Sequence, residues 1–146
     1  MEILIDFPGG ARVDAHFRGH TLMTDQPAGG GGDDLAPMPF ELFLGSIGTC
    51  AGIYILSFCR QRGLPTDGIR ILQRNHPNPA TGLMDRIELE IQVPPAFPKQ
   101  YHDALIRTAE LCKVKKTLEN PPQFEIATKE METVGQSHLN CQRRGL

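Results

Sequence analysis

The strongest constraint on the fold of this chain is one long apolar segment, Pro39 to Arg62, with the sequence PFELFLGSIGTCAGIYILSFCRQR. Proline suits the first turn of a helix, and Glu41 places a negative charge close to the start, where the helix dipole favours it. Gly63 and Pro65 follow the segment directly and are typical of helix ends. The sequence therefore predicts a single long helix over residues 39–62.

This helix is predicted to lie at the centre of a soluble domain or dimer rather than in a membrane. Its longest run without a charge, from Leu42 to Cys59, only just reaches the length of a membrane span. Gly45, Gly48 and Gly52 interrupt the run on one side of the helix, where another backbone could approach closely.

Length and composition limit the class of protein. A chain of 146 residues fits one domain, and 40% hydrophobic with 22% charged residues is ordinary for a globular protein. A net charge of -2 argues against a nucleic-acid binder. Four cysteines without an N-terminal secretion signal indicate a reducing, cytoplasmic location, where thiols are free or form transient catalytic disulfides.

The remaining segments predict an α+β fold. Alternating apolar residues predict short antiparallel strands, a loop is expected over 26–38 (QPAGGGGDDLAPM), and a second helix is expected from Pro98 to about Val114, with a helical turn to Leu118. The predicted strands cover residues 3–5, 13–17, 22–23, 68–72, 84–93 and 124–128. We expect one domain over residues 1–130 and a polar tail over 131–146.

Two cysteines are predicted to face each other across the two helices. At about 100° per residue, Cys50 shares a helix face with Phe43 and Ile47, while Cys112 shares a face of the second helix with Leu105. Both thiols therefore lie on apolar stripes and can approach. The alternative is plain packing, because free cysteine behaves as a small hydrophobe.

The other two cysteines are interpreted as unreactive. Cys59 lies about 13 Å along the helix from Cys50, on the opposite side, which is too far for a disulfide within one helix. It is expected to be a packing residue, and Cys141 an incidental thiol of the tail. A reactive Cys50 needs a nearby cation, because the middle of a helix gains little from the dipole. Lys113, Lys115 and Lys116 could lower the pKa of Cys112, or form only a solvated run.

The segment PMPFELFLGSIGTC, followed by a helical cysteine in AELCKVKKTL, resembles the OsmC/Ohr family, in particular its less characterised branch. The resemblance covers about residues 1–130, including the order of the strands and the glycine-rich loop. It implies antiparallel sheets packed around two central helices, an intertwined homodimer and a role in stress response.

The resemblance also implies a chemistry. Cys50 would be the peroxidatic thiol that attacks an organic hydroperoxide, and Cys112 the resolving thiol that forms a disulfide with it. A dithiol would then reduce that disulfide, with no cofactor and no metal. The family's peroxidases add a glutamate and an arginine. Phe40 occupies the glutamate position here, with Glu41 beside it in a helix-capping position, and Arg12 is the nearest arginine, followed by Arg18.

Two functional hypotheses follow. The first is a thiol-dependent hydroperoxide reductase acting through Cys50 and Cys112. The second is a non-peroxidase member of the same fold that binds an apolar small molecule between the helices. His16 and His20 fall in a predicted strand and turn rather than on one helix face, so no metal site is expected. Neither a nucleic acid nor a membrane is expected as a partner.

Overall fold

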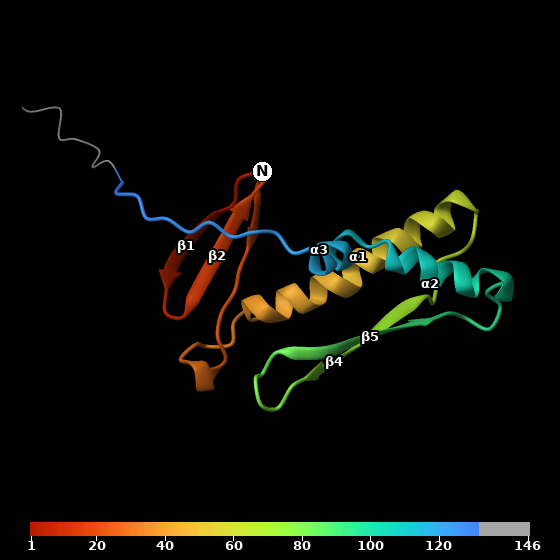
Figure 1. The fold of residues 1–146 in the computed structure, drawn as a ribbon, viewed down its shortest axis with the longest axis horizontal. Coiled ribbons are helices and arrows are strands. Elements are labelled where there is room, and N and C mark those ends of the chain that lie inside the picture. The colour runs from red at the N-terminus through yellow and green to blue at the C-terminus, as the bar shows by residue number, and fades with distance from the viewer. Residues whose placement is uncertain (132–146) are drawn as a thin grey trace, which may run out of the picture.

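The computed structural model describes residues 1–131, which form two antiparallel sheets, three α-helices and two 3-10 turns (Figure 1). The α+β class is therefore confirmed. The elements are β1 (Leu4–Gly9), β2 (Arg12–Phe17), β3 (His20–Leu22), η1 (Ala28–Gly30), α1 (Pro39–Gln61), β4 (Arg70–Pro77), β5 (Met84–Gln92), η2 (Lys99–Tyr101), α2 (His102–Glu110) and α3 (Lys113–Glu119). Most of the predicted tail, including Cys141, lies outside the described residues.

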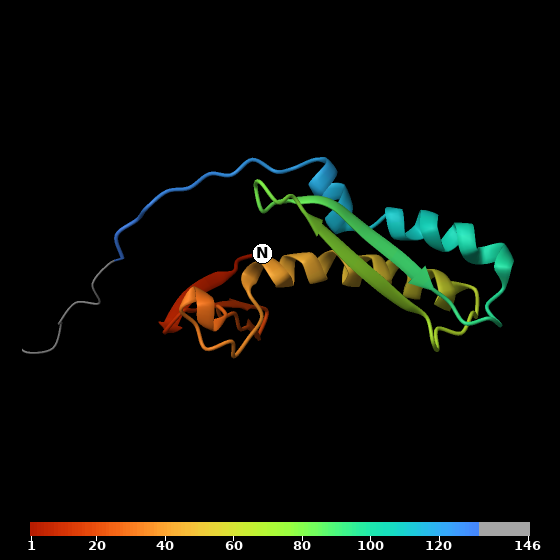
Figure 2. The same cartoon turned by 90° about the horizontal axis from the view of Figure 1, so that it is seen from below.

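The N-terminal sheet has the order β1-β2-β3, with both pairs antiparallel. This confirms the short strands predicted from apolar alternation. Gly9 and Gly10 take positive φ values at the first turn, a conformation that glycine adopts without a steric cost. All residues of β1 are exposed in the single chain. The sheet lies beside the start of α1 rather than over its middle (Figures 1 and 2).

The glycine-rich loop is organised around one buried carboxylate. Asp25 is 1% exposed, and its oxygens accept backbone N–H groups from Gln26, Asp33 and Leu35 at 2.8, 3.2 and 3.0 Å. The N–H groups of Leu35 and Gln26 hold the pKa of Asp25 below its usual value, against the opposing effect of burial. At Gly32 a Cβ atom would overlap the Gln26 carbonyl, so the loop requires glycine there. The loop thus delivers the chain to α1 in a defined conformation.

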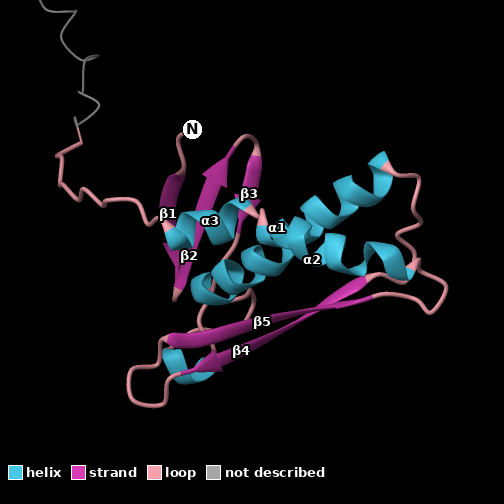
Figure 3. Ribbon diagram, turned by 45° about the vertical axis from the view of Figure 1, so that its right-hand side comes forward, coloured by secondary structure: helices cyan, strands magenta, loops and turns pink. Residues whose placement is uncertain are grey.

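Helix α1 begins where the sequence predicted and ends one residue earlier. Glu41 caps it, because its Oε2 accepts the Met38 backbone N–H at 2.9 Å. The C-terminal half of α1 contributes Ile55, Phe58 and Cys59 to the main hydrophobic core, which Phe97 and Leu105 complete. The β4–β5 hairpin lies along one side of the α1–α2 pair (Figures 1 and 3).

Much of the apolar surface of α1 remains uncovered in one chain. It is the one helix within residues 1–131 long and apolar enough to cross a membrane by length and composition, and only 22% of its most apolar window is buried. Phe40, Phe43 and Ile53 remain 44%, 39% and 61% exposed. An uncovered apolar face of this kind indicates that something else packs against it.

The prediction of the second helix was wrong about where the helix ends, and this affects the site. Instead of continuing to Val114, it ends at Glu110, because the N–H groups of Leu111 and Cys112 bond to carbonyls only three residues earlier. Cys112 has an extended backbone with ψ 129°, and a separate helix, α3, starts after it. Cys112 therefore lies between two helices and not on the face of one.

The last predicted strand is also wrong for the single chain. Residues 124–128 form no strand, and Phe124 and Ile126 are 84% and 96% exposed. The preceding Asn120-Pro121-Pro122 stops α3, since proline cannot continue a helix, and the chain then runs on without pairing with either sheet (Figure 2). In contrast, β4 extends five residues beyond its predicted end, to Pro77.

Candidate functional site

The structure brings Cys50 and Cys112 together. Cys50 lies half-buried in the middle of α1, and Cys112 is the N-cap residue of α3, 1% exposed. The two thiols are neighbours, because the side chain of each is among the groups that shift the pKa of the other. The Cys112 Sγ also lies 3.9 Å from the carbonyl oxygen of Ile47, which precedes Cys50 by about one turn of α1. The Cys112 thiol can therefore donate its proton to this carbonyl.

The surroundings of Cys50 favour its thiolate. Burial alone would raise the pKa of Cys50, but the Val114 backbone N–H, the Cys112 thiol, and the backbone N–H and ammonium of Lys113 together lower it below the ordinary cysteine value. All of these groups come from the start of α3. The helix thus supplies the positive environment that the middle of α1 cannot provide.

The other two buried thiols show the opposite shift. Burial raises the pKa of Cys112, and the adjacent Cys50 raises it further, while the Lys115 and Val114 N–H groups lower it in part. Burial also raises the pKa of Cys59, which is fully enclosed in the core, and Arg62 opposes this only partly. Cys50 is therefore the cysteine within residues 1–131 that ionises first, and Cys112 keeps its proton beside it.

The shift of Cys50 predicts selective alkylation. The rate of its reaction with iodoacetamide should inflect at a lower pH than that of an ordinary cysteine, because the lowered pKa of Cys50 leaves more of the thiol ionised at a given pH. Peptide mass spectrometry of timed samples would follow Cys50 and Cys59 separately, and Cys59 should react far more slowly. A Lys113→Met variant should move the inflection to higher pH, because it removes the ammonium that lowers the pKa of Cys50, while Lys116→Met should not. An inflection at or above the ordinary value would contradict the assignment.

Arg12 and Glu41 are not brought to the thiol pair within one chain. The Arg12 Nη2 forms an ion pair with the Asp14 Oδ2 at 2.6 Å, and Asp14 is itself 5% exposed. Glu41 is engaged in capping α1. The groups that shift the pKa of Cys50 belong to residues 112–114. Catalytic roles for Arg12 and Glu41 therefore stay predictions.

The contribution of α3 was missed from the sequence. The three lysines after Cys112 were considered as neighbours of Cys112, whereas Lys113 acts on Cys50. The break at Leu111 and Cys112 has no glycine or proline to mark it, and cysteine is not a typical N-cap residue. The only sequence feature that pointed to α3 was the separate helical turn expected to end at Leu118.

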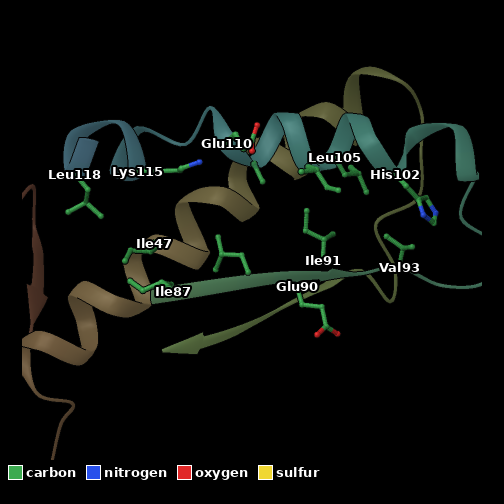
Figure 4. A pocket seen from close by; sticks show the side chains of 13 residues that line it. Ile47, Ile87, Glu90, Ile91, Val93, His102, Leu105, Glu110, Lys115 and Leu118 are labelled. Carbon is green, nitrogen blue, oxygen red and sulfur yellow. The ribbon is translucent and has the colours of Figure 1, made fainter. Parts of the chain in front are cut away.

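An apolar cavity lies between α1, β5, α2 and α3 (Figure 4), and neither cysteine of the pair is among the residues that line it. Its volume is about 650 Å³, within the range typical of small-molecule sites. Ile47 connects it to the thiols, because its side chain lines the cavity and its carbonyl contacts Cys112. The lining residues are Ile47, Ile87, Leu89, Glu90, Ile91, Val93, His102, Leu105, Ile106, Ala109, Glu110, Lys115 and Leu118. The second hypothesis required such a cavity near Cys50.

Of the two histidines considered as metal ligands, His16 is engaged locally. His16 lies on β2 with its Nε2 3.1 Å from the Asp6 carboxylate and its Nδ1 3.1 Å from the Thr21 hydroxyl. Across the described part of the chain, no three His, Cys, Asp or Glu residues are grouped so that they could bind a metal.

Comparisons with known proteins agree with this fold. The family model for OsmC-like protein matches residues 30–127, and no curated protein matches significantly. A putative osmotic stress induced and detoxification response protein of Psychrobacter arcticus is similar, with a TM-score of 0.68 at 19% identity, over 79% of this chain and 85% of that one. An OsmC-like protein of Vibrio cholerae gives a TM-score of 0.60 at 10% identity, over 81% and 92%.

A third similar structure is an organic hydroperoxide resistance protein OsmC of Legionella pneumophila. It gives a TM-score of 0.50 at 17% identity, over 81% of this chain and 89% of that one. At these identities the structural likeness shows the fold alone. The family match covers most of the chain and includes both cysteines of the pair, residues 30–38 of the loop before α1 and the cavity-lining residues. The chain therefore belongs to the OsmC family.

Proposed function

We propose that the protein is a thiol-dependent reductase of organic hydroperoxides, with Cys50 as the peroxidatic and Cys112 as the resolving cysteine. The observation that carries the proposal is a pair of neighbouring thiols whose pKa values are shifted in opposite directions, each by groups that include the other. The thiol with the lowered pKa is the nucleophile, and the protonated thiol beside it reacts second. A neighbouring structure named as an organic hydroperoxide resistance protein is consistent with this assignment.

The chemistry proceeds in three balanced steps. The Cys50 thiolate attacks the terminal oxygen of the hydroperoxide, the O–O bond breaks, and the alcohol leaves after taking a proton, so that Cys50 becomes a sulfenic acid. The Cys112 sulfur then attacks the Cys50 sulfur and displaces water, forming the disulfide. An external dithiol finally reduces this disulfide by exchange and is itself oxidised.

The cavity favours an organic hydroperoxide over hydrogen peroxide. Nine of its lining residues are aliphatic, and one of them, Ile47, also contacts Cys112 through its backbone carbonyl. An alkyl or aryl group of the substrate can bury its surface there, which hydrogen peroxide cannot do. Binding energy from this remote group would be available to position the peroxide oxygen near Cys50.

The proposal is tested by comparing two oxidants. Cumene hydroperoxide should consume the Cys50 thiol at least about tenfold faster than hydrogen peroxide at equal concentration, because only the former uses the cavity. Stopped samples would be alkylated and the Cys50 peptide quantified by mass spectrometry. A Cys59→Ser variant serves as the control and should behave as the wild type. Equal rates with both oxidants, or slow oxidation spread over all cysteines, would contradict the proposal.

A second candidate function is supported by the cavity itself. An OsmC-family protein without peroxidase activity could use a site of about 650 Å³ to bind an apolar small molecule. This function predicts saturable binding together with slow, unselective oxidation of the thiols. The oxidant comparison above therefore separates the two candidates.

The protein is further proposed to act as a homodimer in the cytoplasm. Proteins of this family are generally soluble, so the exposed apolar face of α1 is expected to be covered by protein rather than by lipid. The exposed Phe124 and Ile126 lie within the matched family region and alternate as residues of a strand do. A second copy of the chain is the proposed partner for both surfaces.

A further inference from the structure

We propose that Cys50 and Cys112 together form a binding site for monosubstituted trivalent arsenicals, compounds of the form R–As(OH)₂ in which arsenic carries one carbon group and two exchangeable oxygens. The two sulfurs replace these oxygens and hold the arsenic between α1 and α3. Such binding uses the thiol pair of the proposed function but none of its peroxide chemistry, so either function can fail without the other.

Both sulfurs lie beside the same turn of α1. Helix α3 packs against α1 (Figure 1), and the Cys112 Sγ at its N-cap lies 3.9 Å from the Ile47 carbonyl oxygen. Cys50 follows Ile47 by three residues, and helical side chains tilt toward the N-terminus, so the Cys50 side chain lies near the same carbonyl. Each side chain also acts on the other thiol. One bridging atom can therefore bond to both sulfurs.

A pair of thiols suits trivalent arsenic better than the common biological metals. Thiolate sulfur selects soft elements. Zinc takes at least three protein ligands, whereas no group of three His, Cys, Asp or Glu residues suited to a metal occurs within residues 1–131. A linear ion such as Hg²⁺ needs its two sulfurs on opposite sides, farther apart than two sulfurs beside one carbonyl. The arsenical has two exchangeable positions on one side of the arsenic, which two neighbouring thiols satisfy completely.

The exposure of the two thiols sets the order of the reaction. Cys50 is half-buried and can be reached from solvent, whereas Cys112 is 1% exposed. The Cys50 sulfur displaces the first hydroxide of the arsenical, and the neighbouring Cys112 sulfur displaces the second. Two As–S bonds replace two As–O bonds, the thiol protons leave with the hydroxides as two waters, and arsenic stays trivalent. The second step is intramolecular, so its effective concentration far exceeds that of a free thiol.

The test is titration of the fully reduced full chain with phenylarsine oxide in the absence of peroxide, followed by native mass spectrometry. One adduct per chain is expected, with the mass of phenylarsine oxide less one water, because that loss requires two As–S bonds. Cys50→Ser and Cys112→Ser should each weaken binding at least about 100-fold, since only one As–S bond remains. Cys59→Ser is the matched control and should bind as the wild type, because Cys59 is enclosed in the core.

A second measurement needs no variant. Oxidation of the pair to a disulfide with diamide should abolish binding, and dithiothreitol followed by its removal should restore it. An absence of binding, an adduct that keeps the full mass of phenylarsine oxide, or unchanged binding by Cys112→Ser would overturn the proposal. Loss of binding in Cys59→Ser would overturn it as well. A chain that binds the arsenical but does not consume cumene hydroperoxide would support this site and contradict only the proposed function.

Discussion

Replacing Cys50 with serine is expected to reduce hydroperoxide consumption by at least about 100-fold. A hydroxyl at this position would not ionise near neutral pH, so the N–H groups of Lys113 and Val114 would have no anion to stabilise. The loss would be measured as cumene hydroperoxide consumed in the presence of excess dithiothreitol. Cys59→Ser, in the same helix but in the closed core, is the matched control and should retain activity.

The partner cysteine should give a different result. Cys112→Ser is expected to permit one rapid oxidation of Cys50 but no intramolecular disulfide, so that sulfenic acid accumulates and can be trapped with dimedone. Comparable turnover in the Cys50→Ser and wild-type proteins would remove Cys50 from the mechanism. If the dimedone adduct were equally abundant in the wild type, Cys112 would not act as the resolving cysteine.

The second large effect concerns the exposed face of α1. Ile53→Glu is expected to convert a dimer into monomers, because a carboxylate buried in an apolar interface without a partner costs several kcal/mol. Ile53 is 61% exposed in one chain and has no polar function there. Sedimentation velocity at micromolar concentration would measure the change, with circular dichroism to verify the helix content.

Thr117→Glu provides the control for this variant. Thr117 is an exposed polar residue of α3, so the same charge should leave the sedimentation coefficient unchanged. A wild-type chain that sediments as a monomer would contradict the proposed dimer directly. An Ile53→Glu protein that remains dimeric would instead exclude this face of α1 from the interface.

The sequence predicted the elements whose stability is local. Helix α1 was predicted within one residue, since capping by Glu41 and the stop at Gly63 act on adjacent backbone groups. The β4–β5 hairpin was predicted for a similar reason, because alternate apolar residues face α1 and α2 while charged ones such as Arg74 and Glu90 pair on the outside.

The errors occurred where the structure depends on contacts distant in sequence. The end of α2 places Cys112 against the Ile47 carbonyl, 65 residues away, and no local signal marks that break. Residues 124–128 have the alternation of a strand, but pairing requires a neighbour that a single chain does not present. Periodicity predicts that a segment is amphipathic, not what it packs against.

The candidate site was therefore predicted in part. The pairing of Cys50 with Cys112 was predicted from a family resemblance and from helix faces. In the structure Cys112 approaches from the N-cap of α3 instead of from the face of a helix. The groups that stabilise the Cys50 thiolate are mainly backbone N–H groups at the start of α3, which carry no residue signature. Arg12 and Glu41, selected by their sequence positions, are paired with Asp14 and the α1 backbone within one chain.

The most direct measurement is mass mapping of disulfides after one equivalent of cumene hydroperoxide is added to the fully reduced protein. We expect a single intramolecular bond between the Cys50 and Cys112 peptides, formed with loss of two thiols per chain. Oxidation that leaves Cys50 and Cys112 as free thiols, or that links either of them mainly to Cys59 or Cys141, would contradict it.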